Sequence, residues 1–217
     1  MEDREFDGVT PESASSDGEI EVTKIEKKKK EKTNDPIKNF YDWAEMLILA
    51  ITIVLVIFSF CVRICTVDGS SMEKTLNNGE RVAVWEAFYT PKAGDIVVVQ
   101  SHTYGNKPLV KRVIAAGGQT LKIDFATWTV TVDGKAQRES YAYNYNGRSM
   151  EQANYFSVVA DYMSEDGTVT VPEGYVFVMG DNRNNSRDSR FSEIGFVEYQ
   201  EVIGKVVFDL SDFKGIK

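Results

Sequence analysis

Histidine and cysteine are scarce in this chain of 217 residues. The only histidine, His102, lies in the polar stretch QSHTYGNK, and the only cysteines are Cys61 and Cys65. One histidine and two cysteines cannot form a usual zinc-binding set. A place in an exposed loop is also a better interpretation of His102 than a role as catalytic base. We therefore expect neither a zinc site nor a serine–histidine pair.

Other common ligand-binding patterns are missing as well. The chain has no glycine-rich loop of the P-loop type. The segment GDNRNNSRDSR contains acids and amides, but it lacks the spacing of an EF-hand and ends in arginines that would repel a cation. The formal net charge of -8 gives no indication of a nucleic-acid partner. We expect a protein that uses no metal, no cofactor and no nucleic acid.

A long apolar run follows a polar N-terminal region. Residues 1–38 are rich first in acids and then in lysines, and they predict a flexible tail because they contain little apolar surface to bury. The run from Ala44 to Val62 contains one charged side chain, Glu45. At about 1.5 Å per residue, this length crosses a hydrocarbon layer of ~30 Å. The sequence predicts a transmembrane anchor over residues 39–65.

The charges that flank the apolar run predict its orientation. Lysines crowd its N-terminal side, whereas Arg63 alone lies close on the other side. The positive-inside rule then predicts a single-pass cell-membrane protein with a cytoplasmic N-terminus and an extracytoplasmic domain over residues 66–217. The run is too long and too far along the chain for a cleavable secretory signal. Cys61 and Cys65 would share one face of a helix and pack at the membrane edge, with lipidation or an intermolecular bridge left open. The oligomeric state is not indicated.

Short apolar or alternating runs dominate the rest of the chain and predict a mostly antiparallel β domain. The runs are RVAVWEA, DIVVVQS, PLVKRVIAA, TLKID, TWTVTVDGK, GYVFVMGD and EVIGKVVFDL. The Asp-Gly pair that ends one of them is a hairpin signal. The polar, tyrosine-rich residues 138–170 interrupt the pattern and predict a small inserted lobe or long loop.

The segment VDGSSMEKTL, just beyond the apolar run, offers two adjacent serines, Ser70 and Ser71. A serine hydroxyl needs a base to become a nucleophile, and lysine can serve only if its pKa falls from its usual value near 10.4. Lys111 lies within PLVKRVIAA, where strand alternation places three apolar residues on its face: Leu109, Val113 and Ala115. Apolar surroundings are what a lowered pKa requires, although the pattern alone leaves a surface lysine open.

Four motifs occur in order along the chain. They are Ser71-Met72-Glu73-Lys74-Thr75-Leu76, then Pro91 with Gly94 and Asp95 before Ile96-Val97-Val98-Val99, then Lys111-Arg112-Val113, and last Gly180 through Arg190, GDNRNNSRDSR. In this order, the chain resembles type I signal peptidases, the membrane-bound serine–lysine leader peptidase family, over about residues 37–210. The resemblance implies a β-sheet catalytic domain of signal-peptidase type. It also implies an endopeptidase that removes signal peptides from secretory precursors.

The resemblance also implies roles for individual residues. Ser71 resembles the nucleophile and Lys111 the general base, while backbone N–H groups near Ser71 would stabilise the oxyanion, because Gly69 carries no hydroxyl. Five residues match positions that support this pair: Ser186, which would orient the lysine amine, Asp188 and Arg190, which would form a bracing ion pair, and Asp181 and Arg112. A shallow pocket for small substrate side chains would include Met72, Val110 and Ile114. From the residues alone, a surface cluster of salt bridges is the alternative for four of the charged groups, Asp181, Arg183, Asp188 and Arg190.

The chain departs from the family pattern at four positions. Lys74 replaces a proline, while Ala115, Gly117 and Gln119 replace a typical Gly, Pro and Asp; these changes leave local rigidity and substrate preference open. One alternative function is a non-catalytic anchored β domain that binds precursors or partner proteins. Another is a serine–lysine peptidase that cleaves itself, as repressors of the SOS type do, but the chain has an anchor where those have a DNA-binding domain.

Overall fold

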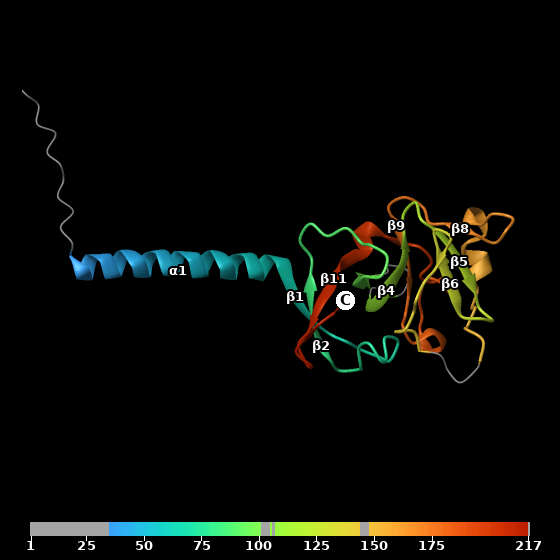
Figure 1. Cartoon of the computed structure of the whole chain (residues 1–217), viewed down its shortest axis with the longest axis horizontal. Coiled ribbons are helices and arrows are strands. Elements are labelled where there is room, and N and C mark those ends of the chain that lie inside the picture. The colour runs from blue at the N-terminus through green and yellow to red at the C-terminus, as the bar shows by residue number, and fades with distance from the viewer. Residues whose placement is uncertain (1–34, 101–104, 106, 144–147, 217) are drawn as a thin grey trace, which may run out of the picture. The chain divides into compact units, whose positions relative to one another are not determined.

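The computed structural model describes residues 35–100, 105, 107–143 and 148–216 (Figure 1). The chain divides into two units, Met1–Glu45 and Met46–Lys217, and the boundary between them lies within the first helix. Most of the predicted tail and His102 fall outside the described residues, so the expectations for them stay predictions.

The helix α1 (Pro36–Cys61) has 26 residues, and none of them is buried. It is long and apolar enough to cross a membrane, and no other helix in the described part of the chain meets that test. A helix that is apolar on all sides and unburied is suited to lipid contact. The chain leaves the helix at Cys61 and enters strand β1, which includes Cys65, so a shared helical face does not relate these two free thiols.

The larger sheet has eight strands among the described residues. Their order is β1-β2-β11-β3-β4-β9-β10, with β12 paired to β11, and every pairing is antiparallel. The strands are β1 (Val62–Thr66), β2 (Arg81–Trp85), β3 (Ile96–Gln100), β4 (Pro108–Ala116), β9 (Tyr175–Met179), β10 (Val197–Glu198), β11 (Val202–Asp209) and β12 (Lys214–Gly215). Strand β4, which carries Lys111, therefore lies between β3 and β9, inside the sheet and away from its edges.

The smaller sheet has four strands in the order β7-β6-β5-β8. They are β5 (Thr120–Asp124), β6 (Thr129–Val132), β7 (Lys135–Ala136) and β8 (Val169–Thr170). Asp133 and Gly134 connect β6 to β7 with φ of 49 and 72, the left-handed values that a tight hairpin requires. The hairpin predicted from the Asp-Gly pair is confirmed.

The region 138–170 packs against the smaller sheet. It contains the short helix α2 (Tyr155–Val158), the 3-10 helix η1 (Ala160–Tyr162) and strand β8. Four of its side chains belong to the same buried cluster as Leu121 and Val130 of the sheet: Met150, Tyr155, Val159 and Val169. These residues help to form the hydrophobic core at this end of the molecule.

The larger sheet buries side chains on both of its faces. Along β3, Ile96 and Val98 belong to one apolar cluster, whereas Val97 and Val99 belong to another, as strand alternation requires. A strand that is buried on both faces is a rigid support for a functional side chain. The remaining described helices are single turns in loops, η2 (Arg183–Asn185) and η3 (Tyr199–Glu201).

The prediction for the face of Lys111 is wrong at one residue. Leu109 and Val113 pack in one apolar cluster, but Ala115 packs in a different one, with the smaller sheet. The register between β4 and β9 shifts between Val113 and Ala115, and this bulge changes the face on which later side chains lie. Seven predicted strand runs otherwise contain the observed strands β2, β3, β4, β5, β6, β9 and β11.

Candidate active site

A turn between β1 and β2 carries Ser71. The N–H groups of Thr75 and Leu76 both donate to the carbonyl of Met72, at 3.0 and 2.8 Å, and close a helical turn. Met72 and Leu76 are four residues apart, so both side chains point the same way, and both are buried in the apolar cluster that contains Val82 and Val84. This apolar attachment fixes the position of Ser71, which precedes it.

Lys111 lies next to Ser71 although 40 residues separate them along the chain. Its Nζ is 2.8 Å from the Oγ of Ser71 and 2.9 Å from the carbonyl oxygen of Val110. The lysine is 2% exposed. Burial lowers the pKa of Lys111 to about 8, although the carboxylates of Asp188 and Asp181 act in the opposite direction. A useful fraction of this amine is therefore neutral near physiological pH, and it can accept a proton.

The two adjacent serines have different partners. The hydroxyl of Ser70 accepts a hydrogen bond from Nδ2 of Asn185 at 2.7 Å, whereas that of Ser71 lies beside Lys111. The backbone N–H of Asn182 donates to the carbonyl of Ser71 at 2.9 Å, and its side chain donates to the carbonyl of Ser70 at 3.1 Å. The segment after β9 thus holds the serine turn in place and leaves the Ser71 hydroxyl to the lysine.

Gly180 is packed where no side chain fits. A Cβ at this position would lie 2.2 Å from the Oγ of Ser186 and 2.5 Å from the carbonyl oxygen of Ser71. Real Cβ atoms essentially never come so close to another atom, so a substitution must push the serine turn and the following loop apart. Glycine at the start of GDNRNNSRDSR is therefore required for this close approach.

Asp188 and Arg190 form a fully buried ion pair. Nε and Nη2 of Arg190 lie 2.7 and 2.8 Å from the two carboxylate oxygens, and both residues are 0% exposed. Burial alone would raise the pKa of Asp188, but Arg190 outweighs it and the pKa is lowered. Arg190 also donates to the carbonyls of Glu151 and Arg183, each at 2.6 Å, so all three of its guanidinium nitrogens form hydrogen bonds.

A second buried pair joins β4 to the segment after β9. Nε and Nη2 of Arg112 donate to the two oxygens of Asp181 at 2.9 and 2.8 Å. The hydroxyl of Thr75 donates to Asp181 at 2.5 Å, and Nη1 of Arg112 donates to the carbonyl of Gly94 at 2.8 Å. This pair connects three parts of the chain: the turn that carries Ser71, strand β4 with Lys111, and the segment after β9 that begins at Gly180. The alternative of a surface salt-bridge cluster is excluded, because Arg112, Asp181, Arg183, Asp188 and Arg190 are all buried.

Two contributing residues were not recognised from the sequence. Glu139 binds Arg183 through two contacts of 2.8 and 2.6 Å and neutralises an arginine that is 0% exposed. The ring of Tyr141 lies 3.9 Å from the guanidinium of Arg112. Both lie in the polar region 138–170, where no local motif marks a residue whose partner is far away along the chain. Their spacing of two, Glu-x-Tyr in a loop, is too common to serve as a signal.

Ser186 is buried near Ser71 and Lys111, the pair that we call the dyad, but forms no hydrogen bond with either of them. Its residue is 5% exposed, and its hydroxyl acts on Asp188, whose pKa it helps to lower by hydrogen bonding. The second contact of the Lys111 amine is instead the carbonyl of Val110. A backbone carbonyl leaves no trace in a sequence motif, so sequence reasoning could not find it.

The three residues expected to line a substrate pocket are not equally placed. Val110 is half-buried and adjoins Lys111, whereas Met72 is 1% exposed and Ile114 is 5% exposed. Met72 and Ile114 also pack in different apolar clusters. Of the three, Val110 is the one that combines partly exposed surface with a position next to Lys111 in β4.

The departures from the family pattern have local explanations. Lys74 has a φ of 76, which a proline ring cannot adopt, and its ammonium lies 4.2 Å from the ring centre of Tyr143. The side chain of Gln119 accepts from the N–H of Ala116 at 2.9 Å and donates to Asp133 at 2.8 Å, so it closes the turn after β4. These changes leave the contact between Ser71 and Lys111 intact.

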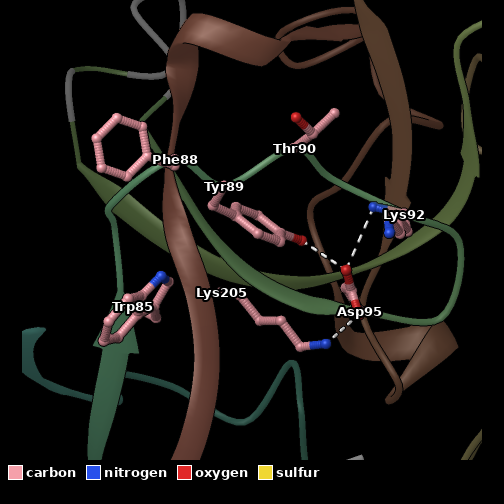
Figure 2. Close-up of a pocket in the computed structure, with 7 residues that line it drawn as sticks. All are labelled: Trp85, Phe88, Tyr89, Thr90, Lys92, Asp95 and Lys205. Atoms are coloured by element: carbon pink, nitrogen blue, oxygen red, sulfur yellow. Dashed lines mark hydrogen bonds and ion pairs between the residues drawn. The ribbon is translucent and has the colours of Figure 1, made fainter. Parts of the chain in front are cut away.

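A pocket of about 430 Å³ is formed by the end of β2, the segment between β2 and β3, and Lys205 of β11 (Figure 2). It is lined by Trp85, Phe88, Tyr89, Thr90, Lys92, Asp95 and Lys205. None of these belongs to the dyad or to its supporting ion pairs. Asp95 is the centre of its polar side, where it accepts hydrogen bonds from Tyr89 at 2.7 Å and from Lys205 at 2.5 Å.

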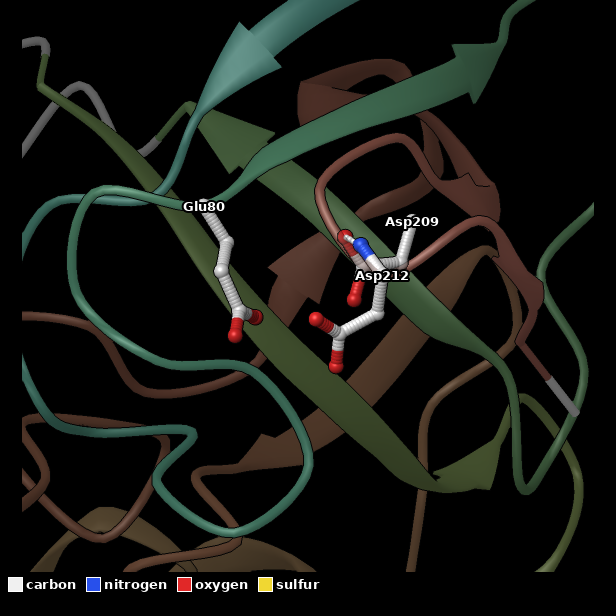
Figure 3. Close-up of side chains that lie close together, drawn as sticks. All are labelled: Glu80, Asp209 and Asp212. Carbon is white, nitrogen blue, oxygen red and sulfur yellow. Dashed lines mark hydrogen bonds between the residues drawn. The ribbon is translucent and has the colours of Figure 1, made fainter.

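Three carboxylates gather at the end of β11 (Figure 3). Oxygens of Glu80, Asp209 and Asp212 lie within 4.8 Å of one another, and Asp209 is buried. The ammonium of Lys214 lies 2.9 Å from Asp212 and 3.5 Å from Asp209, and so supplies positive charge to the cluster. We interpret the group as a structural ion-pair cluster that fastens the turn between β11 and β12.

Known proteins resemble this chain over most of its length. Residues 40–210 match the family described as signal peptidase, peptidase S26. Signal peptidase I of Bacillus licheniformis is 33% identical over 190 residues, which cover 86% of this chain and 97% of that protein. Signal peptidase IB of Staphylococcus aureus is 34% identical over 187 residues, which cover 83% of this chain and 94% of that protein. A crystal structure of a signal peptidase I from Enterococcus faecalis aligns with a TM-score of 0.38 and 26% identity, over 55% of this chain and 99% of that one.

These matches define the chain as a peptidase, and therefore as a hydrolase. It belongs to the signal peptidase family, peptidase S26. The resemblance inferred from the four motifs is confirmed, as is the mostly antiparallel β architecture.

Proposed function

We propose that this chain is a membrane-anchored signal peptidase I that cleaves signal peptides from secretory precursors, with Ser71 as nucleophile and Lys111 as general base. The observation that carries the proposal is the 2.8 Å distance between the Ser71 hydroxyl and a buried lysine amine. Family membership supports the activity, and the lowered pKa of Lys111 supports its role. With a pKa of about 8, roughly a tenth of the amine is neutral at pH 7.

The reaction begins with proton transfer within the dyad. The neutral amine of Lys111 accepts the Ser71 proton while the serine oxygen bonds to the scissile carbonyl carbon. The carbonyl of Val110, 2.9 Å from Nζ, orients the amine so that its lone pair is directed at the hydroxyl. The tetrahedral intermediate then expels the leaving amine, which takes the proton back from the Lys111 ammonium. The product is an acyl-enzyme at Ser71.

Hydrolysis of the acyl-enzyme repeats these roles with water. Lys111 accepts a proton from the water, the water oxygen bonds to the acyl carbon, and the proton returns to Ser71 when the ester bond breaks. In both steps, a backbone N–H at Ser71 can stabilise the oxyanion, because that group donates to no backbone acceptor within the described residues. Gly69 has a φ of 98, which glycine adopts readily, and it has no side chain that could donate to the oxyanion.

The proposed substrate follows from where the dyad lies on the chain. Ser71 is ten residues beyond Cys61, the end of α1, so the dyad stays close to the membrane surface. Lysines before the helix orient the N-terminus to the cytoplasm, which puts the peptidase domain, residues 66–217, on the extracytoplasmic side. A precursor held in the bilayer by its apolar segment presents its small-residue cleavage site at this height. We propose that surface beside Val110 favours alanine-sized side chains at that site.

Cleavage of a purified test precursor by the detergent-solubilised full chain tests the proposal. We expect Ser71→Ala and Lys111→Met to reduce cleavage by about 10³-fold or more. The matched controls Ser70→Ala and Lys122→Met, a neighbouring serine and an exposed lysine, should cleave normally. Bulky residues at both small positions of the precursor should stop cleavage by the unaltered enzyme. Full activity of either dyad variant would contradict the assignment of the dyad.

The same preparation distinguishes the alternative of a non-catalytic binding domain. A serine-acylating reagent should add its acyl group to Ser71 of the unaltered chain, as read by peptide mass mapping. A binding domain would bind the precursor without cleaving it and would leave Ser71 unlabelled.

A further inference from the structure

Two exposed aromatic side chains lie beside the end of α1. Trp85 ends β2 and is paired in register with Val62, the first residue after the helix. The backbone N–H of Glu86 donates to the carbonyl of Cys61, the last residue of the helix, at 3.0 Å. The segment 85–88 is therefore fastened to the point where the chain leaves the proposed membrane span.

Phe88 is fully exposed in a conformation that bulky residues avoid. Its side chain is 108% exposed, and its φ of 51 lies in the left-handed region. Such strain persists when the surrounding structure requires it, and it is concentrated at functional surfaces. Trp85 is 37% exposed, and its indole N–H donates to the carbonyl of Ala87 at 2.8 Å. Aromatic rings beside a membrane span are typical of the bilayer interface.

The pocket next to these rings has a net positive charge. Figure 2 shows Trp85 and Phe88 on one side, Asp95 and Lys92 on the other, and Lys205 between them. The carboxylate of Asp95 already accepts hydrogen bonds from Tyr89 and Lys205. The exposed side chain of Lys92 forms no ion pair within the described part of the chain. The pocket therefore has two lysines, Lys92 and Lys205, and one aspartate, Asp95. Because Lys92 has no carboxylate partner in the pocket, its ammonium can bind a phosphate group.

We propose that this pocket binds the phosphate-bearing headgroup of an anionic membrane phospholipid. In the complex, Trp85 and Phe88 lie in the bilayer interface, and Lys92, with Lys205, contacts the phosphate. The inference rests on the membrane anchorage of the proposed function, because the helix α1 delivers the pocket to the bilayer surface. Binding there holds the peptidase domain at the membrane surface through a second contact, in addition to the helix α1.

Quenching of Trp85 by lipids tests the inference on the full chain. In a Trp43→Phe and Trp128→Phe background, Trp85 is the one remaining tryptophan. The protein is reconstituted into vesicles of phosphatidylglycerol and phosphatidylcholine that carry a quencher at the headgroup level. We expect strong quenching, and we expect Lys92→Gln to shift the ratio of quenched to unquenched Trp85 about fivefold, the effect of one lysine at an anionic surface. Phe88→Ser should act in the same direction.

Matched controls separate this site from general surface effects. Phe213 is also exposed and has a φ of 51, but it lies in the turn between β11 and β12, so Phe213→Ser should leave the quenching unchanged. Lys135→Gln, at another exposed lysine, should also have no effect. As a second measurement without substitutions, a photoactivatable phospholipid should crosslink to a peptide that contains residues 85–92.

Two outcomes overturn the inference. If Trp85 is not quenched and the phospholipid does not crosslink to residues 85–92, the pocket does not contact lipid. If the Lys92→Gln variant is quenched as strongly as the unaltered chain, Lys92 does not bind the phosphate group. Precursor cleavage in detergent, measured on the same variants, does not depend on lipid contact, so its loss would instead count against the proposed function.

Discussion

The backbone N–H of Asn182 donates a hydrogen bond to the carbonyl of Ser71 at 2.9 Å. This contact is one of several that join the turn carrying Ser71 to the segment that follows β9, more than 100 residues later. The buried pair of Arg112 and Asp181 joins the same segment to the lysine strand. The positions of Ser71 and Lys111 are thus fixed through a common third element, and the dyad geometry depends on the packing of that element.

The close packing at Gly180 predicts that Gly180→Ala disturbs the dyad. The added methyl group would displace the Ser71 carbonyl and the Ser186 hydroxyl, which overlap with it at 2.5 and 2.2 Å. We expect loss of most activity and a decrease of about 1–3 kcal/mol in the free energy of unfolding. Chemical denaturation in detergent and precursor cleavage measure the two effects. Gly215→Ala is the control, because its Cβ meets nothing within 4 Å; an equal effect of both variants would contradict the packing argument.

The buried amine of Lys111 should decrease the stability of the protein at neutral pH. Its pKa is lowered from 10.5 to about 8, so the folded state resists protonation that the unfolded chain accepts. Its contribution to the free energy of unfolding is therefore most favourable above pH 10.5, and about 3 kcal/mol of it is lost as the pH falls to below 8.

The substitution Lys111→Met tests this cost directly. We expect it to abolish activity and to raise the free energy of unfolding by about 1–3 kcal/mol at pH 7, with a smaller gain at pH 10. Denaturant melts at the two pH values provide the measurement. A variant that is less stable than the unaltered chain at pH 7 would show that the amine is solvated or charged without cost.

The ion pair of Asp188 and Arg190 should contribute strongly to stability. Asp188→Asn leaves the buried Arg190 without its counter-ion, and we expect a loss of about 3–5 kcal/mol. The exposed pair of Arg187 and Glu193, 3.5 Å apart, provides the control: Glu193→Gln should change stability by less than about 0.5 kcal/mol. Thermal unfolding of the two variants makes the comparison. Similar small effects of both would indicate that the 188–190 pair is hydrated in solution.

Ser186 allows a structural role to be separated from a functional one. Its hydroxyl helps to lower the pKa of the buried Asp188, so Ser186→Ala removes one weak hydrogen bond and should lower the melting temperature by no more than about 2–4 °C. If the serine orients the Lys111 amine during the reaction, as we propose from the family resemblance, kcat should fall while KM stays near its original value. Unchanged kcat in this variant would leave the orientation of the amine to the carbonyl of Val110 alone.

Regular patterns in the sequence predicted most of the sheet. Alternating runs of Val, Ile and Thr gave the longer strands, because each buries at least one face. Strand β1 was hidden, because Val62, Ile64 and Cys65 continue the apolar composition of the helix before them and only Arg63 interrupts it. The strands of two residues, β7, β8, β10 and β12, are too short to show any period. The bulge before Ala115 depends on pairing with β9, which local alternation does not encode.

The site shows a similar division. Motif resemblance predicted Ser71 and Lys111, and the structure places them within hydrogen-bond distance. The contacts of Glu139 with Arg183 and of Val110 with Lys111 depend on tertiary packing and on a backbone atom, so no spacing in the sequence reveals them. Met72 lies beside Ser71 in sequence, yet its side chain anchors the turn in the core.

The rate of Ser71 acylation as a function of pH tests the central claim most directly. Labelling of the full chain by a serine-acylating reagent is followed by mass mapping across the pH range, with Lys111→Met as control. We predict a rate that rises about tenfold per pH unit and levels off above about pH 8, because the neutral amine of Lys111 is the active form. Lys111→Met should remain unlabelled. A rate governed by a group with a pKa near 6.5, or equal labelling of Lys111→Met, would contradict a lysine base.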